Sequence, residues 1–315
     1  MRAARLHEFG QSPTVDDVDI PVRETGQSLL KVEAAALGHL DISVASGTFD
    51  IKPTLPHIGG TNAAAIVVES DSIAVGTRVL VRGGGIGLFK SGCWAEFMVA
   101  PDTALTLVDP RLSPSVAATF GLPTSTGYVA VHDVAQVKPG ERVIVSGASG
   151  SVGSMAAQFA LLAGASEVIG VVPRADQIGL LPTGVRPVVG RGEELAATLG
   201  QEPIANVLVD TLGGDVVSQL IPRVYPGGRA ALIGYTLGGS LTLDLPNWLL
   251  SDVKILPVNM MRQNARTAEL IPGIVERLVA GELTLATQEF PLEDIATALR
   301  LMQDGMLTGR AVVVP

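Results

Sequence analysis

Apolar positions follow two different patterns along the chain. In residues 1–120, short runs such as Ser28 to Ala35, Ala63 to Glu69 and Arg78 to Arg82 alternate apolar and polar side chains between turn residues. A period of two is typical of strands that bury one face. This part of the sequence therefore predicts a β-rich, mainly antiparallel domain.

The pattern changes between about residues 121 and 258. Short apolar runs now alternate with helix-compatible segments, and we expect strands at Arg142 to Ser146, Glu167 to Val172, Val207 to Asp210 and Arg229 to Ile233. Nearly continuous Val, Ile and Leu is typical of a parallel sheet that helices cover on both faces. The segment thus predicts an α/β domain with the doubly wound parallel sheet of the Rossmann type.

The last part, residues 259–315, contains an amphipathic helix, a second helix at Leu292 to Gln303 and an apolar run at Ala311 to Val314. We expect this run to return to the first domain as an additional strand, which makes that domain discontinuous (1–120 and 259–315). The stretch Gly238 to Pro246 is interpreted as an extended edge strand after the Rossmann core. Because an open edge favours pairing with a second copy, a homodimer is expected.

Composition narrows the function classes. A chain of 315 residues is long enough for two domains of about 100–200 residues each. With 47% hydrophobic and 17% charged residues, it has the composition of a folded protein. The 22 Lys and Arg against 31 Asp and Glu give a formal charge of −9, which disfavours nucleic acids and anionic membranes. A small-molecule substrate is the expected partner.

Cysteine usage and the N-terminal sequence bear on location. The single cysteine, Cys93, forms no internal disulfide and no structural zinc site, and we expect it to be an inert packing residue. The N-terminus lacks an apolar leader, and no uninterrupted apolar stretch is long enough to span a membrane. These observations predict a cytoplasmic protein.

The most informative segment, Arg142 to Ala165, leads from a predicted strand through three glycines into an Ala-rich helix. Such glycines let backbone amides approach a pyrophosphate, and the positive end of the helix favours that anion. Relative to G-x-G-x-x-G, the first glycine is replaced by Ala148, so the motif is imperfect. The residues expected to hold a dinucleotide here are Ala148, Ser149, Gly150, Ser151, Val152 and Gly153.

The second predicted strand ends about 20 residues after this turn, where the adenosine ribose is recognised. It is followed by Pro173 and Arg174, and no carboxylate occurs before Asp176. An arginine here accommodates the 2′-phosphate of NADP, whereas an acidic residue favours NAD. We therefore predict NADPH, with Arg174 as phosphate ligand and Arg191 as a second candidate. The alternative is that Arg174 is a solvated loop residue.

Eight segments occur in a characteristic order: LLKVEAAALGHLDISVASG, LPHIGGTNAAAIVVE, GCWAEFMVAPDTALTLVD, LPTSTGYVAV, KPGERVIVSGASGSVG, LVDTLGG, GGRAALIGY and LTGRAVVVP. In this order they resemble the quinone oxidoreductases of the medium-chain dehydrogenase/reductase superfamily. The resemblance implies a GroES-like substrate domain, a Rossmann domain and a cofactor in the cleft between them. The cofactor-binding residues that it adds are Thr126 near the nicotinamide, Thr211, Leu212 and Gly213 near the adenosine, Gly234 and Tyr235 near the nicotinamide ribose, and Asn259.

At two sets of positions this chain differs from related enzymes in residues that would take part in the chemistry. The positions that match the Cys, His and Cys ligands of zinc alcohol dehydrogenases are Gly38, Thr61 and Leu122, none of which binds zinc, so no metal is expected. Positions where quinone reductases frequently carry Asn, two Tyr, Glu and a later Tyr are occupied by Gly38, Ser43, Phe49, Asn62 and Gly190.

Without a metal, hydride transfer needs an electron-poor acceptor such as a quinone or an enone, whose developing charge one donor stabilises. The catalytic candidates are His39, Asp41 and Thr126, and the substrate-pocket candidates are Ser43, Phe49, Asn62, Trp94 and Tyr128. Each candidate has an alternative structural role. His39 is either a proton source or a structural histidine, and Asp41 either takes part in catalysis or holds its own loop. Phe49 and Trp94 are either walls of the pocket or core residues.

Three functions follow from this sequence. The first is an NADPH-dependent, zinc-independent reductase of quinones or similar conjugated carbonyls. The second is an NADPH-dependent reductase of enone, alkenal or enoyl double bonds. The third is an NADPH-binding sensor or structural protein with weak catalysis, which the loss of several polar pocket residues favours.

Overall fold

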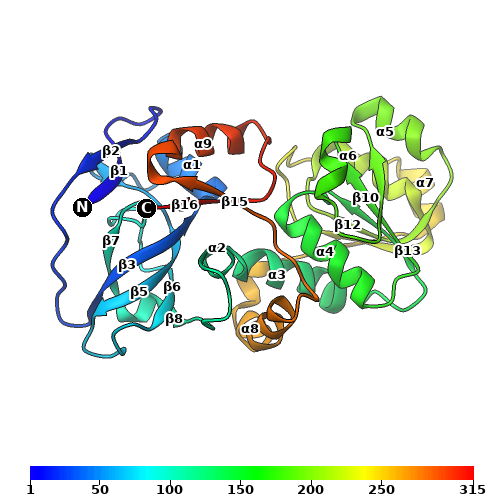
Figure 1. Cartoon of the computed structure of the whole chain (residues 1–315). Coiled ribbons are helices and arrows are strands. Elements are labelled where there is room, and N and C mark those ends of the chain that lie inside the picture. The colour runs from blue at the N-terminus through cyan, green and yellow to red at the C-terminus, as the bar shows by residue number, and fades with distance from the viewer. The chain divides into compact units, whose positions relative to one another are not determined.

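The computed structural model describes residues 1–315 and divides into two compact units, each of which is described by itself (Figure 1). Unit 1 comprises Met1–Gly121 and Ala286–Pro315, and unit 2 comprises Leu122–Leu285. No helix in either unit is both long enough and apolar enough to span a bilayer.

Residues 259–285, which we expected in the first domain, lie in unit 2. Their contacts give the reason. Arg266 forms an ion pair with Asp133 at 2.9 Å and lies over the ring of Tyr128. The Thr284 amide donates to the side chain of Gln158 at 2.8 Å. An amphipathic pattern predicts that a helix buries one face, but these pairings decide which core it covers.

Unit 1 contains ten strands and three α-helices. The strands are β1 (Arg2–Leu6), β2 (Thr14–Asp17), β3 (Gln27–Ala36), β4 (His57–Ile58), β5 (Asn62–Glu69), β6 (Arg78–Arg82), β7 (Phe97–Pro101), β8 (Leu105–Leu107), β15 (Thr287–Pro291) and β16 (Arg310–Val314). The helices are α1 (His39–Ala45), α2 (Pro114–Thr119) and α9 (Ile295–Gln303), with 3₁₀ turns at Asp102–Ala104 and Leu292–Asp294. One sheet has the order β2-β1-β4 and the other the order β15-β16-β3-β5-β6-β8, with β7 paired to β3.

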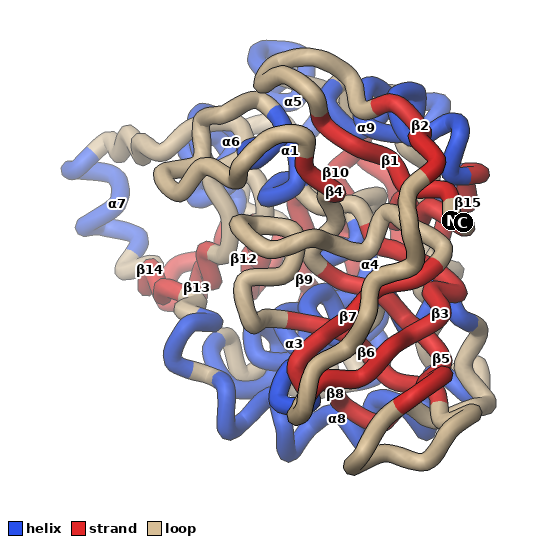
Figure 2. The backbone as a smooth tube through the Cα atoms, turned by 90° about the vertical axis from the view of Figure 1, so that its left-hand side faces the viewer, coloured by secondary structure: helices blue, strands red, loops and turns tan.

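The core of unit 1 confirms the alternating pattern. Leu30, Val32 and Ala34 of β3 are buried, whereas Lys31 between them is exposed. Strands β3, β5 and β6, which run side by side in Figure 2, coincide with the three alternating runs of the sequence. The C-terminal strand β16 pairs antiparallel with β3, so the terminal run does return to this unit.

Unit 2 contains one six-stranded sheet with helices. The strands are β9 (Arg142–Ser146), β10 (Glu167–Val172), β11 (Val185–Val189), β12 (Ala205–Asp210), β13 (Val224–Leu232) and β14 (Lys254–Pro257). The α-helices are α3 (Gly121–Tyr128), α4 (Ser151–Leu162), α5 (Gly192–Leu199), α6 (Gly214–Leu220), α7 (Leu245–Ser251) and α8 (Asn264–Val279). A π-helical segment spans Val129–Val134, and 3₁₀ turns span Ala175–Leu180, Ile221–Arg223 and Met260–Arg262.

The sheet of unit 2 is parallel throughout, with the order β11-β10-β9-β12-β13-β14. This order confirms a doubly wound Rossmann sheet, in which the order of the strands reverses between β9 and β12. The central strands are buried along almost their whole length, as a sheet covered on both faces requires. A ligand of such a sheet binds outside the carboxyl ends of β9 and β12.

The predicted edge strand at residues 238–246 was wrong. No strand forms there, and the edge of the sheet is β14 instead. Asp244 accepts a hydrogen bond from the Asn247 amide and begins helix α7, with a proline in its first turn. The preceding loop is held by the Ser218 hydroxyl, which accepts from the Thr242 amide. An N-cap and a proline therefore override the alternating pattern of this segment.

Candidate functional site

The turn between β9 and α4 lies at the switch point of the sheet. Gly147 has a positive φ of 59°, which glycine adopts without strain. Gly150 is the N-cap of α4, and the amides of the first turn of a helix have no partner within the helix. Amides and a positive helix end of this kind favour an anion such as a pyrophosphate.

Close backbone packing holds this turn. A Cβ atom on Gly153 would lie 2.2 Å from the carbonyl oxygen of Gly147, so only glycine allows the start of α4 to approach the strand end. The Ala148 amide donates to the Val171 carbonyl of β10 at 3.2 Å, and its side chain is fully buried. Ala148 therefore packs inward, which explains how the imperfect motif still forms the turn.

A buried hydrogen-bond network joins the ends of β9 and β12. The Ser146 hydroxyl donates to Asp210 at 2.6 Å and accepts from the Thr211 amide, and Asp210 also accepts from the Gly213 amide at 2.8 Å. Burial raises the pKa of the Asp210 carboxyl. The hydrogen bonds that this carboxyl accepts lower its pKa, but the effect of burial is larger. The network fixes the second loop, Thr211 to Gly213, beside the glycine turn.

Ser146 and Asp210 were not among the site residues that we predicted from the sequence. Each is a polar residue at the last position of an otherwise apolar parallel strand. That position is where ligands meet a doubly wound sheet, so the signal was present in the sequence. Gln177 was also missed. It accepts from the Ser149 hydroxyl at 2.8 Å, so this hydroxyl has a protein partner.

The two arginines proposed for the ribose phosphate follow neighbouring strands. Val172 at the end of β10 is in register with Val189 at the end of β11. Arg174 follows Val172 by two residues, and Arg191 follows Val189 by two residues. Arg174 is 40% exposed and forms an ion pair with Asp176 at 3.1 Å. Arg191 is exposed. The carboxyl edge thus presents two guanidinium groups on adjacent strands, one of them paired to an acid.

The remaining cofactor candidates occupy varied environments. A Cβ on Gly234 would lie 2.2 Å from the Thr211 carbonyl oxygen, so the loop after β13 packs directly on the loop after β12. Tyr235 is 78% exposed beside it. Asn259 caps a 3₁₀ turn through its side chain. Thr126 is buried in α3, where its hydroxyl donates to the Leu122 carbonyl at 2.7 Å.

Tyr128 belongs to an aromatic cluster of unit 2. Its ring lies 4.4 Å from that of His132 and 5.4 Å from that of Phe159, measured between centroids, and Arg266 covers it. Burial lowers the pKa of His132. These contacts hold the ring of Tyr128 within unit 2.

In unit 1, Asp41 is buried at the start of α1. Its carboxylate accepts from the Gly38 amide at 2.7 Å and from the Thr61 amide at 3.0 Å. Burial raises the pKa of Asp41 to about 6, and the hydrogen bonds together with the charge of Arg310 oppose this rise. Asp41 therefore joins two loops of the unit, which agrees with the loop-holding interpretation.

We expect Asp41 to make unfolding depend on pH. The folded state has the higher pKa, so it binds more protons than the unfolded state between about pH 4 and pH 6. The contribution of Asp41 to the free energy of unfolding should fall by about 3 kcal/mol as pH rises through this window. In Asp41→Asn this contribution disappears, so the stability difference between wild type and variant should be larger at pH 4 than at pH 7.

Urea unfolding at pH 4 and pH 7 measures this difference. Asp304→Asn, which changes an exposed carboxylate after α9, is the matched control and should leave the pH dependence unchanged. If wild type and Asp41→Asn differ by the same amount at both pH values, the raised pKa is contradicted.

The other unit 1 candidates range from the exposed His39 through the half-buried Ser43, Phe49 and Asn62 to the buried Trp94. His39 is exposed at the first position of α1, and Ser43 and Phe49 follow it, joined by a hydrogen bond from the Phe49 amide to the Ser43 carbonyl. Asn62 donates to the Thr61 hydroxyl at 3.3 Å. Trp94 is 2% exposed and packs against Gly59 and Gly60, as the core interpretation of this residue predicted.

The single cysteine lies in the core of unit 1. Cys93 is fully buried and its thiol donates to the Gly60 carbonyl, and burial raises its pKa well above the usual range. Across residues 1–315 no group of three or more His, Cys, Asp and Glu side chains is arranged to hold a metal ion.

Comparisons with known proteins agree with this geometry. The family model described as "Alcohol dehydrogenase GroES-like domain" matches residues 24–110, and "Zinc-binding dehydrogenase" matches residues 151–276. The chain is 32% identical to a quinone oxidoreductase of Lama guanicoe over 247 residues, which cover 74% of this chain and 73% of the relative. It is 26% identical to a quinone oxidoreductase of Rattus norvegicus over 311 residues, or 95% and 92% of the two chains. A solved NAD-dependent alcohol dehydrogenase is similar with a TM-score of 0.81 at 25% identity, over 100% of both chains.

Proposed function

Because this chain belongs to the medium-chain dehydrogenase/reductase superfamily, in its quinone oxidoreductase-like branch, we propose that it is a zinc-independent, NADPH-dependent reductase of quinones or similar conjugated carbonyls. The observation that carries the proposal is the glycine turn at the carboxyl end of β9, beside two arginines at the ends of β10 and β11. Membership of the superfamily makes the chain an oxidoreductase with a nicotinamide cofactor. The phosphate form of the cofactor and the acceptor are the proposed parts.

The residues of unit 2 fit a dinucleotide. Gly153 lets the start of α4 pack against the Gly147 carbonyl, and the amides of Ser151 to Gly153 would bind a pyrophosphate at this turn. The Ser146 and Asp210 network would hold the Thr211 to Gly213 loop at the adenosine. Arg174 and Arg191 would bind the 2′-phosphate. When bound, the cofactor supplies the hydride.

An electron-poor acceptor suits the residues that this chain carries. Gly38, Thr61 and Leu122 stand where zinc alcohol dehydrogenases have their ligands, and none of them offers a metal donor. In a quinone or enone the negative charge develops on a conjugated oxygen, which a single hydrogen-bond donor stabilises. We propose His39 as that donor, with Ser43 and Phe49 beside it on the substrate side. Asp41, buried behind them, acts as a positioning residue.

A panel of acceptors tests the function. NADPH consumption should be followed with quinones, enones and simple aldehydes, with NADH as the control. We expect turnover with quinones, at least ~10-fold lower kcat/KM with NADH because one charge-assisted contact is lost, and none with aldehydes. Activity on enones alone would assign the chain to the second function given above. Nucleotide binding without turnover of any acceptor would contradict the proposal that the chain is an enzyme.

The proposed enzyme is a homodimer. Helix α7 carries Leu245, Leu249 and Leu250 at 55%, 64% and 83% exposure, and the edge strand β14 follows it. Exposed apolar side chains next to an unpaired strand edge favour association with a second copy. Light scattering should give the mass of two 32.5 kDa chains.

Leu249→Glu with Leu250→Glu should shift this mass to that of one chain. Val22→Glu, at an 89% exposed position of unit 1, should leave the dimer intact. A monomeric wild type at micromolar concentration would contradict the dimer.

A further inference from the structure

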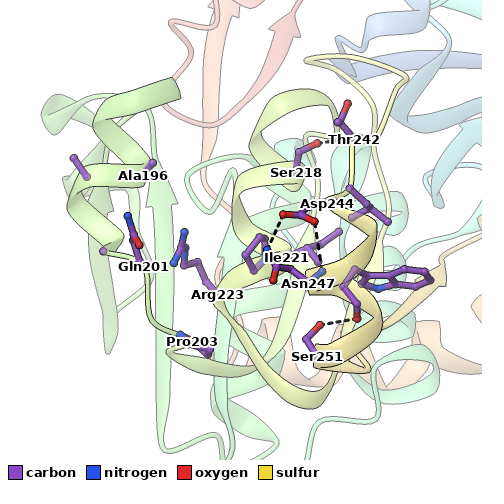
Figure 3. Close-up of a pocket in the computed structure, with 15 residues that line it drawn as sticks. Ala196, Gln201, Pro203, Ser218, Ile221, Arg223, Thr242, Asp244, Asn247 and Ser251 are labelled. Atoms are coloured by element: carbon purple, nitrogen blue, oxygen red, sulfur yellow. Dashed lines mark hydrogen bonds between the residues drawn. The ribbon is translucent and has the colours of Figure 1, made fainter.

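Unit 2 has a cavity that the proposed function does not use. Its volume is about 740 Å³, which is within the range of small-molecule sites. It lies between the end of α5, the end of α6 and one face of α7, as Figure 3 shows. Its polar lining includes Gln201, Ser218, Arg223, Thr242, Asp244 and Asn247, and its apolar lining includes Ile221, Leu243 and Trp248.

The cavity includes residues at the amino ends of the strands, whereas the glycine turn lies at their carboxyl ends. Pro203 and Arg223, which line it, lie just before β12 and β13 begin. The glycine turn and the Thr211 to Gly213 loop follow the ends of β9 and β12. Helix α6 runs from Gly214 to Leu220, a length of about 10 Å, and connects that loop to the cavity. A ligand here is therefore separate from the dinucleotide.

Arg223 is the unpaired group of this cavity. Its Nε and Nη1 atoms are buried without a hydrogen-bond partner, and the side chain forms no ion pair within 4.0 Å. Burial lowers its pKa, and only the charge of Glu202 opposes this. The side chain as a whole is half-buried. Buried guanidinium nitrogens without a partner are unfavourable, and an anion in the cavity would supply the partner that the protein does not. Figure 3 shows the side chain between Gln201 and Ile221.

Most other polar groups of the lining already have partners. Asp244 accepts from the backbone and side chain of Asn247, at 3.4 and 2.6 Å. Ser218 donates to the Gly214 carbonyl and accepts from the Thr242 amide. The indole of Trp248 donates to the Val253 carbonyl at 2.8 Å, which fixes its ring as part of the apolar wall. Arg223 is thus the group that would recognise a charged ligand.

We propose that this cavity binds a small amphipathic carboxylate, whose anionic head pairs with Arg223 and whose apolar body packs on Ile221, Leu243 and Trp248. A guanidinium matches the planar geometry of a carboxylate. A monoanion is favoured over a phosphate because the cavity offers one cation, while Asp244 lines it and Glu202 lies near Arg223. The apolar wall requires a hydrocarbon or aromatic body of the ligand.

Calorimetric titration with 3-phenylpropanoate tests the proposal, and 3-phenylpropanamide serves as the neutral analogue. Both are titrated first without NADP⁺ and then with saturating NADP⁺, which fills the nucleotide site. We expect one molecule of the acid per chain with a Kd below about 1 mM, and at least ~10-fold weaker binding of the amide. The fluorescence of Trp248 should change in the same titration.

Arg223→Met should weaken binding of the acid by at least ~10-fold and leave NADPH binding unchanged. Its melting temperature should equal or exceed that of the ligand-free wild type, because the variant removes two buried guanidinium nitrogens that have no partner. Arg300→Met, at an exposed position of α9 in unit 1, is the matched control and should bind the acid normally.

The proposal is overturned if the wild type shows no saturable binding of the acid, or if acid and amide bind equally. Both comparisons use the unaltered protein, so they remain decisive if the variant fails to fold. Loss of acid binding on addition of NADP⁺ would place the acid in the nucleotide site and would also overturn it. Absence of enzymatic activity does not bear on this test.

Discussion

Gly153→Ala should abolish tight binding of NADPH. The added Cβ would lie 2.2 Å from the Gly147 carbonyl oxygen, which is backbone and has no freedom to rotate away. The start of α4 must therefore move away from the turn, and its amides then no longer point toward the pyrophosphate. Losing two charge-assisted bonds at about 1.5–3 kcal/mol each corresponds to a roughly 100-fold or larger increase in Kd.

Gly273→Ala is the matched control for this variant. Gly273 also lies inside a helix of unit 2, and a Cβ there would meet no atom within 4 Å. This control should bind NADPH normally and gain up to about 1 kcal/mol of stability from helix propensity. Fluorescence titration with NADPH and thermal unfolding should be measured on both variants. Unchanged NADPH affinity in a folded Gly153→Ala protein would refute the assignment of the turn.

Arg174→Ala should change the choice between the two nicotinamide cofactors. If Arg174 binds the 2′-phosphate, its loss removes one charge-assisted contact and raises the Kd for NADPH by about 10- to 100-fold. The Kd for NADH should stay the same, since NADH lacks this phosphate. Asp176→Asn should not weaken the binding of NADPH, because it frees the Arg174 guanidinium from its ion pair.

Arg186→Ala provides the comparison at the other end of the same strands. Arg186 lies near the start of β11 and pairs with Glu167 at the start of β10, so it should not affect either cofactor. Binding constants for NADPH and NADH measured for all four proteins give the ratio directly. A ratio that Arg174→Ala leaves unchanged would assign the phosphate to another group, with Arg191 the next to test.

The sequence predicted the strands of the Rossmann sheet where β-branched residues run without interruption. The predicted bounds of β9 and β10 match the structure. Strand β11 was missed because Arg186 and Pro187 break its apolar run, and β14 because it has only four residues. Such short or interrupted strands form because their neighbours in the sheet supply the pairing, which a local pattern does not contain.

The site was predictable where chemistry depends on neighbouring residues in the sequence. The glycine turn and Arg174 are of this kind, since each is defined by its position after a strand. Hydrogen bonds between distant segments were not predictable. Asp210 reaches Ser146 across 64 residues, and Gln158 reaches Thr284 across 126. The burial of Asp41 and Trp94 likewise depends on which loops of unit 1 pack over them, which no local pattern determines.

The two tryptophans of the chain give each unit its own optical signal. Trp94 is enclosed in the core of unit 1, whereas Trp248 lies partly exposed on the wall of the cavity in unit 2. The emission of an enclosed indole lies at shorter wavelength than that of a hydrated one. Spectral separation during denaturation would therefore reveal whether the two halves of this protein melt together or one after the other.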